Sequence, residues 1–93
     1  MIQTTTIQSE HASKYLTVLC RHFSRKVEAK WDDLNGHVNF PMGEATMRVE
    51  EDNLLIQCKA EDEHKLKGVI AIIESHVHLF SRRETITLQW HSA

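Results

Sequence analysis

Two helix-to-strand junctions with nearly the same sequence constrain the fold of this chain most. The phrase Phe-Ser-Arg plus a second basic residue occurs at residues 23–26 and again at 80–83, and a tryptophan follows each, at Trp31 and Trp90. A helical apolar pattern precedes each phrase and an alternating pattern follows it, which predicts a helix, a basic stop and a strand, used twice. In each strand the tryptophan has the parity of the apolar residues, so we expect both indoles on the buried face.

The remaining patterns predict the other elements. We expect Ser9 to cap the first helix and Asp62 the second. Asn35-Gly36 predicts a turn with positive φ, and Gly68, inside the second helix, predicts a close packing contact. The predicted strands are 3–8, 27–32, 37–40, 45–50, 54–60 and about 85–91, with helices from 9 to 23 and from 62 to 80.

This order, β-α-β-β-β-β-α-β, predicts a single α+β domain over residues 1–93. Strands joined by tight turns are antiparallel neighbours, and one sheet face is apolar, so both helices should pack on that face as a two-layer sandwich. The outward face should be polar and solvated by default. It would carry Glu28, Lys30, His37, Asn39, Thr46, Arg48, Gln57, Lys59, Thr85, Thr87 and Gln89.

Charge and composition exclude some classes of partner. The chain has 11 basic and 13 acidic residues and a formal net charge of −2, which argues against nucleic acid as the main partner. It has no long apolar run and no signal-peptide pattern, so we expect no membrane partner and a cytoplasmic location. Cys20 and Cys58 lack the spacing of a zinc or redox pair and are expected to be buried thiols in a reducing compartment.

His22 and His76 are the most interesting candidate site residues. Each lies at the boundary of a helical core stripe, so the two could meet across the helix pair and hold a ligand or ion, or act as acid and base. The structural alternative is that each spans core and solvent and hydrogen-bonds a neighbour, which is the commoner role of a boundary histidine. We assign no catalytic residue, because the sequence has no catalytic constellation. We assign no metal ligand, because His76 and His78, two apart on a helix, point to nearly opposite sides.

Arginines at the two basic stops complete the candidate ligand-binding set. Arg25 and Arg83, each beside a second basic residue, could bind a phosphate or carboxylate, since arginine binds such groups bidentately. Cations at helix C-termini also stabilise the helix, and the dipole there opposes anion binding, so capping is the preferred interpretation. Ile72 and Leu79 fall on the same side of the second helix as His76, and this apolar flank could close a homodimer.

The chain also resembles a small bacterial family catalogued as domain of unknown function 2218. The resemblance spans nearly the whole sequence. It is carried by Lys14-Tyr15-Leu16, Leu19-Cys20-Arg21-His22-Phe23, Arg25-Lys26, Trp31, Gly36, Phe40-Pro41-Met42-Gly43, Ala60-Glu61-Asp62, His78-Leu79-Phe80 and Arg83-Glu84. It implies a compact α+β domain, no catalytic residues to carry over, and an association with iron-siderophore uptake and reduction proteins. On that association, His22, Arg25 and the Phe40–Gly43 stretch are the first positions to test.

The sequence therefore predicts a non-enzymatic cytoplasmic binding or accessory protein, linked through the resemblance to iron-siderophore metabolism and to a protein partner in it. The absence of a catalytic constellation supports this interpretation. The alternative is a small enzyme or metal binder that uses His22 and His76, with Cys20 as a further candidate. No cofactor is indicated, and the distance between the two imidazoles is the observation that discriminates between these hypotheses.

Overall fold

The polypeptide runs through eight elements in the predicted order. The structure is a computed structural model that describes residues 1–80 and 86–92, with Phe80 described by its backbone. Predictions that concern residues 81–85, and the side chain of Phe80, lie outside this description. The elements are β1 (Ile2–Gln8), α1 (Ala12–Phe23), β2 (Glu28–Trp31), β3 (Asn35–Phe40), β4 (Gly43–Glu50), β5 (Asn53–Ala60), α2 (Glu63–Phe80) and β6 (His91–Ser92).

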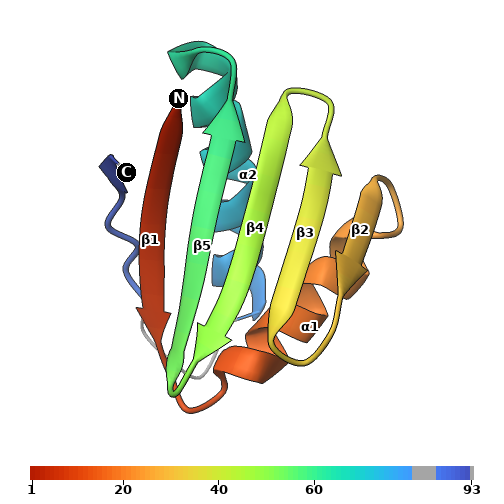
Figure 1. Ribbon diagram of the computed structural model, residues 1–93, viewed down its shortest axis with the longest axis vertical. Coiled ribbons are helices and arrows are strands. Elements are labelled where there is room, and N and C mark those ends of the chain that lie inside the picture. Colours follow the sequence, from red (N-terminus) through yellow and green to blue (C-terminus); the bar gives the residue numbers. More distant parts are fainter. Residues whose placement is uncertain (81–85, 93) are drawn as a thin grey trace.

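The strands form one antiparallel sheet in the order β2-β3-β4-β5-β1-β6. The four consecutive strands β2 to β5 are neighbours because tight turns join them, and β1 lies beside β5, with Ile2 opposite Lys59. The N-terminal ammonium of Met1 donates to the carbonyl oxygen of Ala60 at 2.8 Å and fixes this register at the end of β5. Both helices lie on one face of the sheet (Figure 1), which confirms the predicted two-layer α+β sandwich.

The core lies between that sheet face and the helices. α1 and α2 contribute the apolar stripes that their helical spacing predicts, and alternate residues of the strands face them. Fully burying one such aliphatic side chain contributes about 1.5–3 kcal/mol, so this layer supplies most of the stabilisation. Its largest fully buried side chains are Leu16, Leu19, Cys20, Val38, Met47, Leu54, Ile56, Cys58, Val69 and Ile73.

The C-terminal segment differs from the predicted strand. Among the residues described after α2, 86–92, His91 and Ser92 pair with β1 and residues 86–90 have no regular structure. The predicted alternation survives there, because Ile86, Leu88 and Trp90 are half-buried against the core. Hydrogen bonds from side chains hold this segment in place of the backbone hydrogen bonds of a paired strand. The Thr5 hydroxyl donates to the carbonyl oxygen of Gln89 at 2.8 Å, and the Trp90 indole N–H donates to Glu74 at 3.1 Å.

The β2–β3 connection shows that the predicted Asn-Gly turn is wrong. No described glycine has positive φ, and Gly36 lies within β3 opposite Trp31. The Asp32 carboxylate forms the turn instead, because it accepts the backbone N–H groups of Leu34 and Asn35 at 2.9 and 2.8 Å. These two hydrogen bonds hold the pKa of Asp32 below its ordinary value. Trp31 has the predicted parity but lies on an edge strand with 36% of its surface exposed, so its predicted burial is incomplete.

Three further predictions concern the caps of the two helices and the packing around Gly68. Asp62 caps α2 as expected, since its carboxylate accepts the Lys65 N–H at 2.8 Å. The Ser9 hydroxyl oxygen accepts the His11 N–H at 3.0 Å, but α1 begins two residues later than predicted, with His11 in the cap position and no side-chain cap bond. A methyl group at Gly68 would lie 3.7 Å from Met42, an ordinary contact, so the predicted close approach is absent there.

Candidate functional site

The candidate site lies where α1 ends against α2 and the β3–β4 turn. α1 closes in a tight turn, in which the N–H groups of Lys26 and Val27 both donate to the carbonyl oxygen of Phe23 at 3.0 Å. This turn reverses the chain toward β2 and leaves Arg25 and Lys26 at the rim of a pocket. The basic stop that the sequence pattern indicated is therefore also one wall of the site.

His22 and His76 meet across the helix pair, as one of the two sequence hypotheses required. Their ring centroids are 4.9 Å apart, with an angle of 55° between the planes. Nδ1 of His76 lies 2.7 Å from the carbonyl oxygen of Ile72. Because a carbonyl oxygen only accepts, Nδ1 carries the hydrogen, and Nε2 of the neutral ring holds the lone pair. This bond fixes the tautomer and the orientation of His76.

Two phenylalanines extend the histidine pair into a row of four rings. The Phe23 ring lies 4.7 Å from the ring of His76, centroid to centroid, and 5.2 Å from that of Phe40. Phe23 and Phe40 meet edge to face at 83°, the arrangement that the quadrupoles of aromatic rings favour. The row thus starts at Phe40 on β3, passes through Phe23 at the end of α1 to His76 on α2, and bends back to His22 on α1, whose ring lies 6.3 Å from that of Phe23.

These rings line a pocket of about 420 Å³, which we call the His22–His76 groove. Most of its lining is apolar, and the imidazoles and the basic stop supply the polar groups. This combination of an apolar body with few convergent polar groups is typical of small-molecule sites. The groove is lined by His22, Phe23, Arg25, Lys26, Val27, Phe40, Pro41, Ile72 and His76.

The surroundings of His22 disfavour its protonated form. Partial burial lowers the pKa of His22 below its ordinary value of 6.5, and the nearby charges of His76, Arg25 and Lys26 lower it further. The cations Arg25 and Lys26 thus lie close enough to His22 to oppose its protonation, and an anion bound there would reduce this repulsion.

The structure brings together three of the four predicted ligand-binding residues. His22, Arg25 and His76 line the same groove, and Arg83 lies outside the described residues. Phe40 and Pro41 were indicated only by the family motif. Ile72 was assigned to a dimer flank, and Phe23 and Val27 were predicted only as parts of the helix 9–23 and the strand 27–32. Their participation depends on how the β3–β4 turn approaches α2, which no local pattern encodes.

The two cysteines supply no reactive thiolate to this site, and the described residues supply no cluster of metal ligands. Burial raises the pKa of Cys20 to about 11 and that of Cys58 to about 12, so neither provides a thiolate near neutral pH. Within residues 1–80 and 86–92, no three histidine, cysteine or carboxylate side chains gather as a metal site would require. The histidine pair therefore offers two imidazole nitrogens without a third protein ligand from the described chain.

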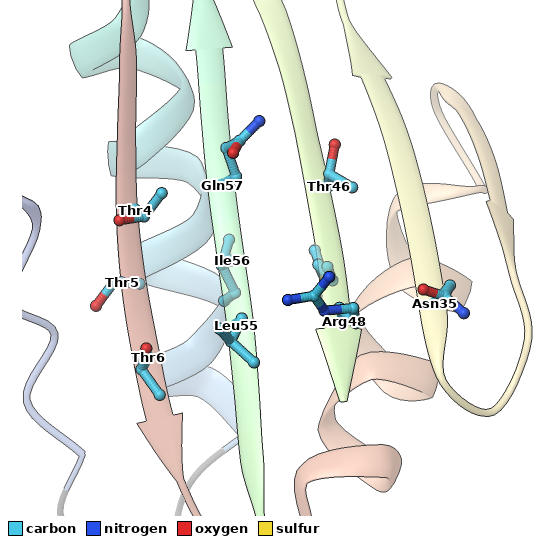
Figure 2. A pocket seen from close by; sticks show the side chains of 10 residues that line it. Thr4, Thr5, Thr6, Asn35, Thr46, Arg48, Leu55, Ile56 and Gln57 are labelled. Carbon is cyan, nitrogen blue, oxygen red and sulfur yellow. The ribbon is translucent and has the colours of Figure 1, made fainter. Parts of the chain in front are cut away.

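A second hollow, of about 370 Å³, lies on the outward sheet face (Figure 2). Thr4, Thr46, Gln57 and Arg48 project there, away from the helices, as alternation predicts for β4 and β5. Arg48 is paired with Glu50 at 2.9 Å, and the other polar groups shown are neutral hydroxyls and amides. With its charge already paired and no aromatic side chain in its lining, this hollow is the weaker candidate.

Comparison with known proteins places the chain in a family. No curated protein matches it, and no helix among the described residues is long and apolar enough to cross a membrane. The NMR structure of PA4090 from Pseudomonas aeruginosa has the same fold, with a TM-score of 0.80 at 21% identity over 97% of this chain and 94% of that one. The model of the family described as "Uncharacterized protein conserved in bacteria (DUF2218)" matches residues 4–91, so the chain belongs to the DUF2218 family.

Proposed function

We propose that this protein is a non-enzymatic binding protein for a small anionic ligand, which it holds in the His22–His76 groove. The observation that carries the proposal is the convergence of two imidazoles, Arg25 and Lys26 on one mostly apolar pocket of about 420 Å³. The apolar lining would desolvate the body of the ligand, and the cations would fix its charged end.

The end of α1 supports a ligand-binding role for the two cations over simple capping. The backbone N–H groups of Ser24, Arg25, Lys26 and Val27 already satisfy carbonyl oxygens of the last turn of α1. Arg25 and Lys26 form no ion pair with another residue of the described chain, unlike Arg48 on the opposite face. Their charges thus remain available to a ligand at the rim.

Native mass spectrometry of protein purified gently from its own host tests this proposal. We expect a reproducible extra mass on the wild-type protein that is lost in both His22→Ala and Arg25→Ala. Arg48→Ala is the matched control, since it removes one cation from the outward sheet face, and it should retain the mass. An extra mass that survives in both groove variants, or is lost equally in Arg48→Ala, would contradict the site.

We further propose that the protein acts in the cytoplasm as an accessory protein of iron-siderophore metabolism, together with a siderophore-related protein partner. This part of the proposal rests on the family resemblance. It predicts that the ligand-bound fraction depends on iron supply. The same spectra, recorded on protein from iron-limited and iron-replete cells, should differ in the proportion of the loaded form. Equal proportions would leave the binding proposal intact and remove its connection to iron.

The fixed tautomer of His76 favours one second candidate, a metal binder or an acid–base enzyme. An Nδ1–H bond to a backbone carbonyl is the usual way to orient an imidazole for Nε2 chemistry, and His22 lies beside it. Calorimetric titration of the apo-protein with Zn²⁺ tests the metal arm. One-to-one binding that is lost in His22→Ala would support this candidate against the anion-binding proposal, and weak binding equal in both proteins would oppose it.

A further inference from the structure

We infer that the ligand of the His22–His76 groove is a monoanionic aromatic acid, a carboxylate carried on a planar ring of one or two cycles. The inference rests on the proposed function and deepens it by naming the ligand class. It follows from three features of the groove: the row of rings, the position of the cations and the size of the pocket.

The row of rings favours a planar aromatic body over an aliphatic one. Phe40, Phe23, His76 and His22 follow one another at centroid distances of 5.2, 4.7 and 4.9 Å, and all four line the groove. Adjacent rings are tilted by 55° to 83°, so both ring edges and ring faces are near the same space. A planar ligand can meet such a lining edge to face or offset, which gives an attraction that an aliphatic body of equal area lacks.

The cations favour a single carboxylate over a polyphosphate. Arg25 and Lys26 follow the C-terminal end of α1, where the helix dipole is negative and opposes a dense anion. The groove includes neither a helix N-terminus nor a glycine-rich loop, which are the usual partners of phosphate groups. The planar guanidinium of Arg25 matches one carboxylate bidentately, and Lys26 adds a second, less directional charge.

The volume limits the ligand to a small one. At about 420 Å³ the groove is near the lower end of the range for ligand pockets. A ligand of one or two fused rings with a carboxylate suits this space, whereas a nucleotide or a peptide would extend beyond it.

Calorimetric titration with three probes of matched size tests the inference. The probes are 1-naphthoate, its saturated analogue decahydronaphthalene-1-carboxylate, and the neutral 1-naphthalenemethanol. We expect 1-naphthoate to bind about tenfold more tightly than either analogue, since the first comparison removes the aromatic ring and the second removes the charge. Equal binding of the two acids would overturn the aromatic class while leaving the anion-binding proposal in place.

Two groove variants and one control variant test whether these binding preferences arise in the groove. Phe40→Leu should reduce the preference for the aromatic acid over the saturated one, and Arg25→Gln should reduce the preference for either acid over the alcohol. Arg48→Gln, on the outward sheet face, should change neither preference, and thermal melts confirm that each variant is folded. If neither acid binds wild-type protein at millimolar concentration, the inference fails, and the native mass spectra of the host-purified protein decide separately whether the proposed function stands. If the preferences persist unchanged in both groove variants, the site is wrong.

Discussion

At the residue scale, the three glycines differ in how much space the structure leaves for a side chain. A Cβ at Gly43 would lie against the backbone carbonyl oxygen of Lys59, and a Cβ at Gly36 would lie 2.7 Å from the sulfur of Cys20. A Cβ at Gly68 would meet Met42 at an ordinary 3.7 Å. The first two glycines therefore permit close packing, whereas Gly68 only lowers the stability of its helix.

Alanine substitution should separate these roles. We expect Gly43→Ala to reduce the free energy of unfolding by about 1–3 kcal/mol or more, because a backbone atom cannot move aside cheaply. Gly68→Ala should increase it by about 0.5–1 kcal/mol through helix propensity alone. Urea denaturation of the two variants beside wild type gives both values. A loss of stability in Gly68→Ala would show that the contact with Met42 is tighter than described.

The two tryptophans should also differ, although their sequence contexts are alike. Trp31 is 36% exposed on the edge strand, so Trp31→Ala should cost about 1–2 kcal/mol, less than the 3–5 kcal/mol typical of a buried aromatic. Trp90→Phe should cost about 1 kcal/mol by removing the hydrogen bond to Glu74. A double-mutant cycle with Glu74→Ala isolates that bond, and strictly additive losses would argue against it.

At the element scale, the contact between the end of α1 and α2 predicts a pH dependence of stability. Burial lowers the pKa of His22 in the folded protein, and the charges of His76, Arg25 and Lys26 lower it further. As the pH falls below about 6.5, the unfolded chain binds this proton before the folded chain does, so the free energy of unfolding decreases. The contribution of His22 is present above that pH and is lost as the pH falls through the folded pKa.

Urea midpoints at pH 7.5 and 5.5 measure this effect. His22→Gln should show a smaller decrease between the two pH values than wild type, because glutamine cannot bind the proton. His64→Gln, which changes an exposed histidine in the first turn of α2, is the matched control and should leave the wild-type decrease unchanged. Equal decreases in His22→Gln and wild type would show that the contact does not disfavour the charged imidazole.

How much the sequence predicts depends on whether a feature is local. Periodicity indicated the order of the elements and the faces of the strands, and residue type indicated the Asp62 cap, because each depends on neighbours in sequence. These local patterns failed where a group distant in the sequence determines the local structure. Gly36 is required by the sulfur of Cys20 packed over β3, and not by a turn. The 86–90 segment bonds to Thr5 and Glu74 in place of a ladder.

The candidate site could likewise be predicted only in its local features. The boundary positions of His22 and His76 follow from helical spacing, and their proximity was one of two hypotheses left open. The groove itself also needs Phe40 and Pro41, which the β3–β4 turn brings beside α2. The strand order of the sheet sets that approach, and the order could not be read from the sequence because β1 and β6 pair at long range.

At the scale of the whole molecule, the proposed homodimer through Ile72 and Leu79 is open to a direct test. Leu79 is 50% exposed, whereas Ile72 lines the groove, so only Leu79 can be changed without altering the site. If the flank closes a dimer, Leu79→Glu should give a folded monomer by light scattering, with monomer stability changed by about 0.5 kcal/mol or less. A wild-type protein that is already monomeric, or a dimer that persists in the variant, would contradict this seam.

The central claim is that the groove, and not the outward sheet face, is the binding site. The most direct measurement is a titration of ¹⁵N-labelled protein with one aromatic and one aliphatic acid, 1-naphthoate and octanoate, followed by two-dimensional NMR. We predict saturable shifts of amide signals at the end of α1, the β3–β4 turn and the middle of α2, with signals around Thr46 and Arg48 unchanged. Shifts centred on Thr46 and Arg48, or no saturable shifts with either acid, would contradict the account.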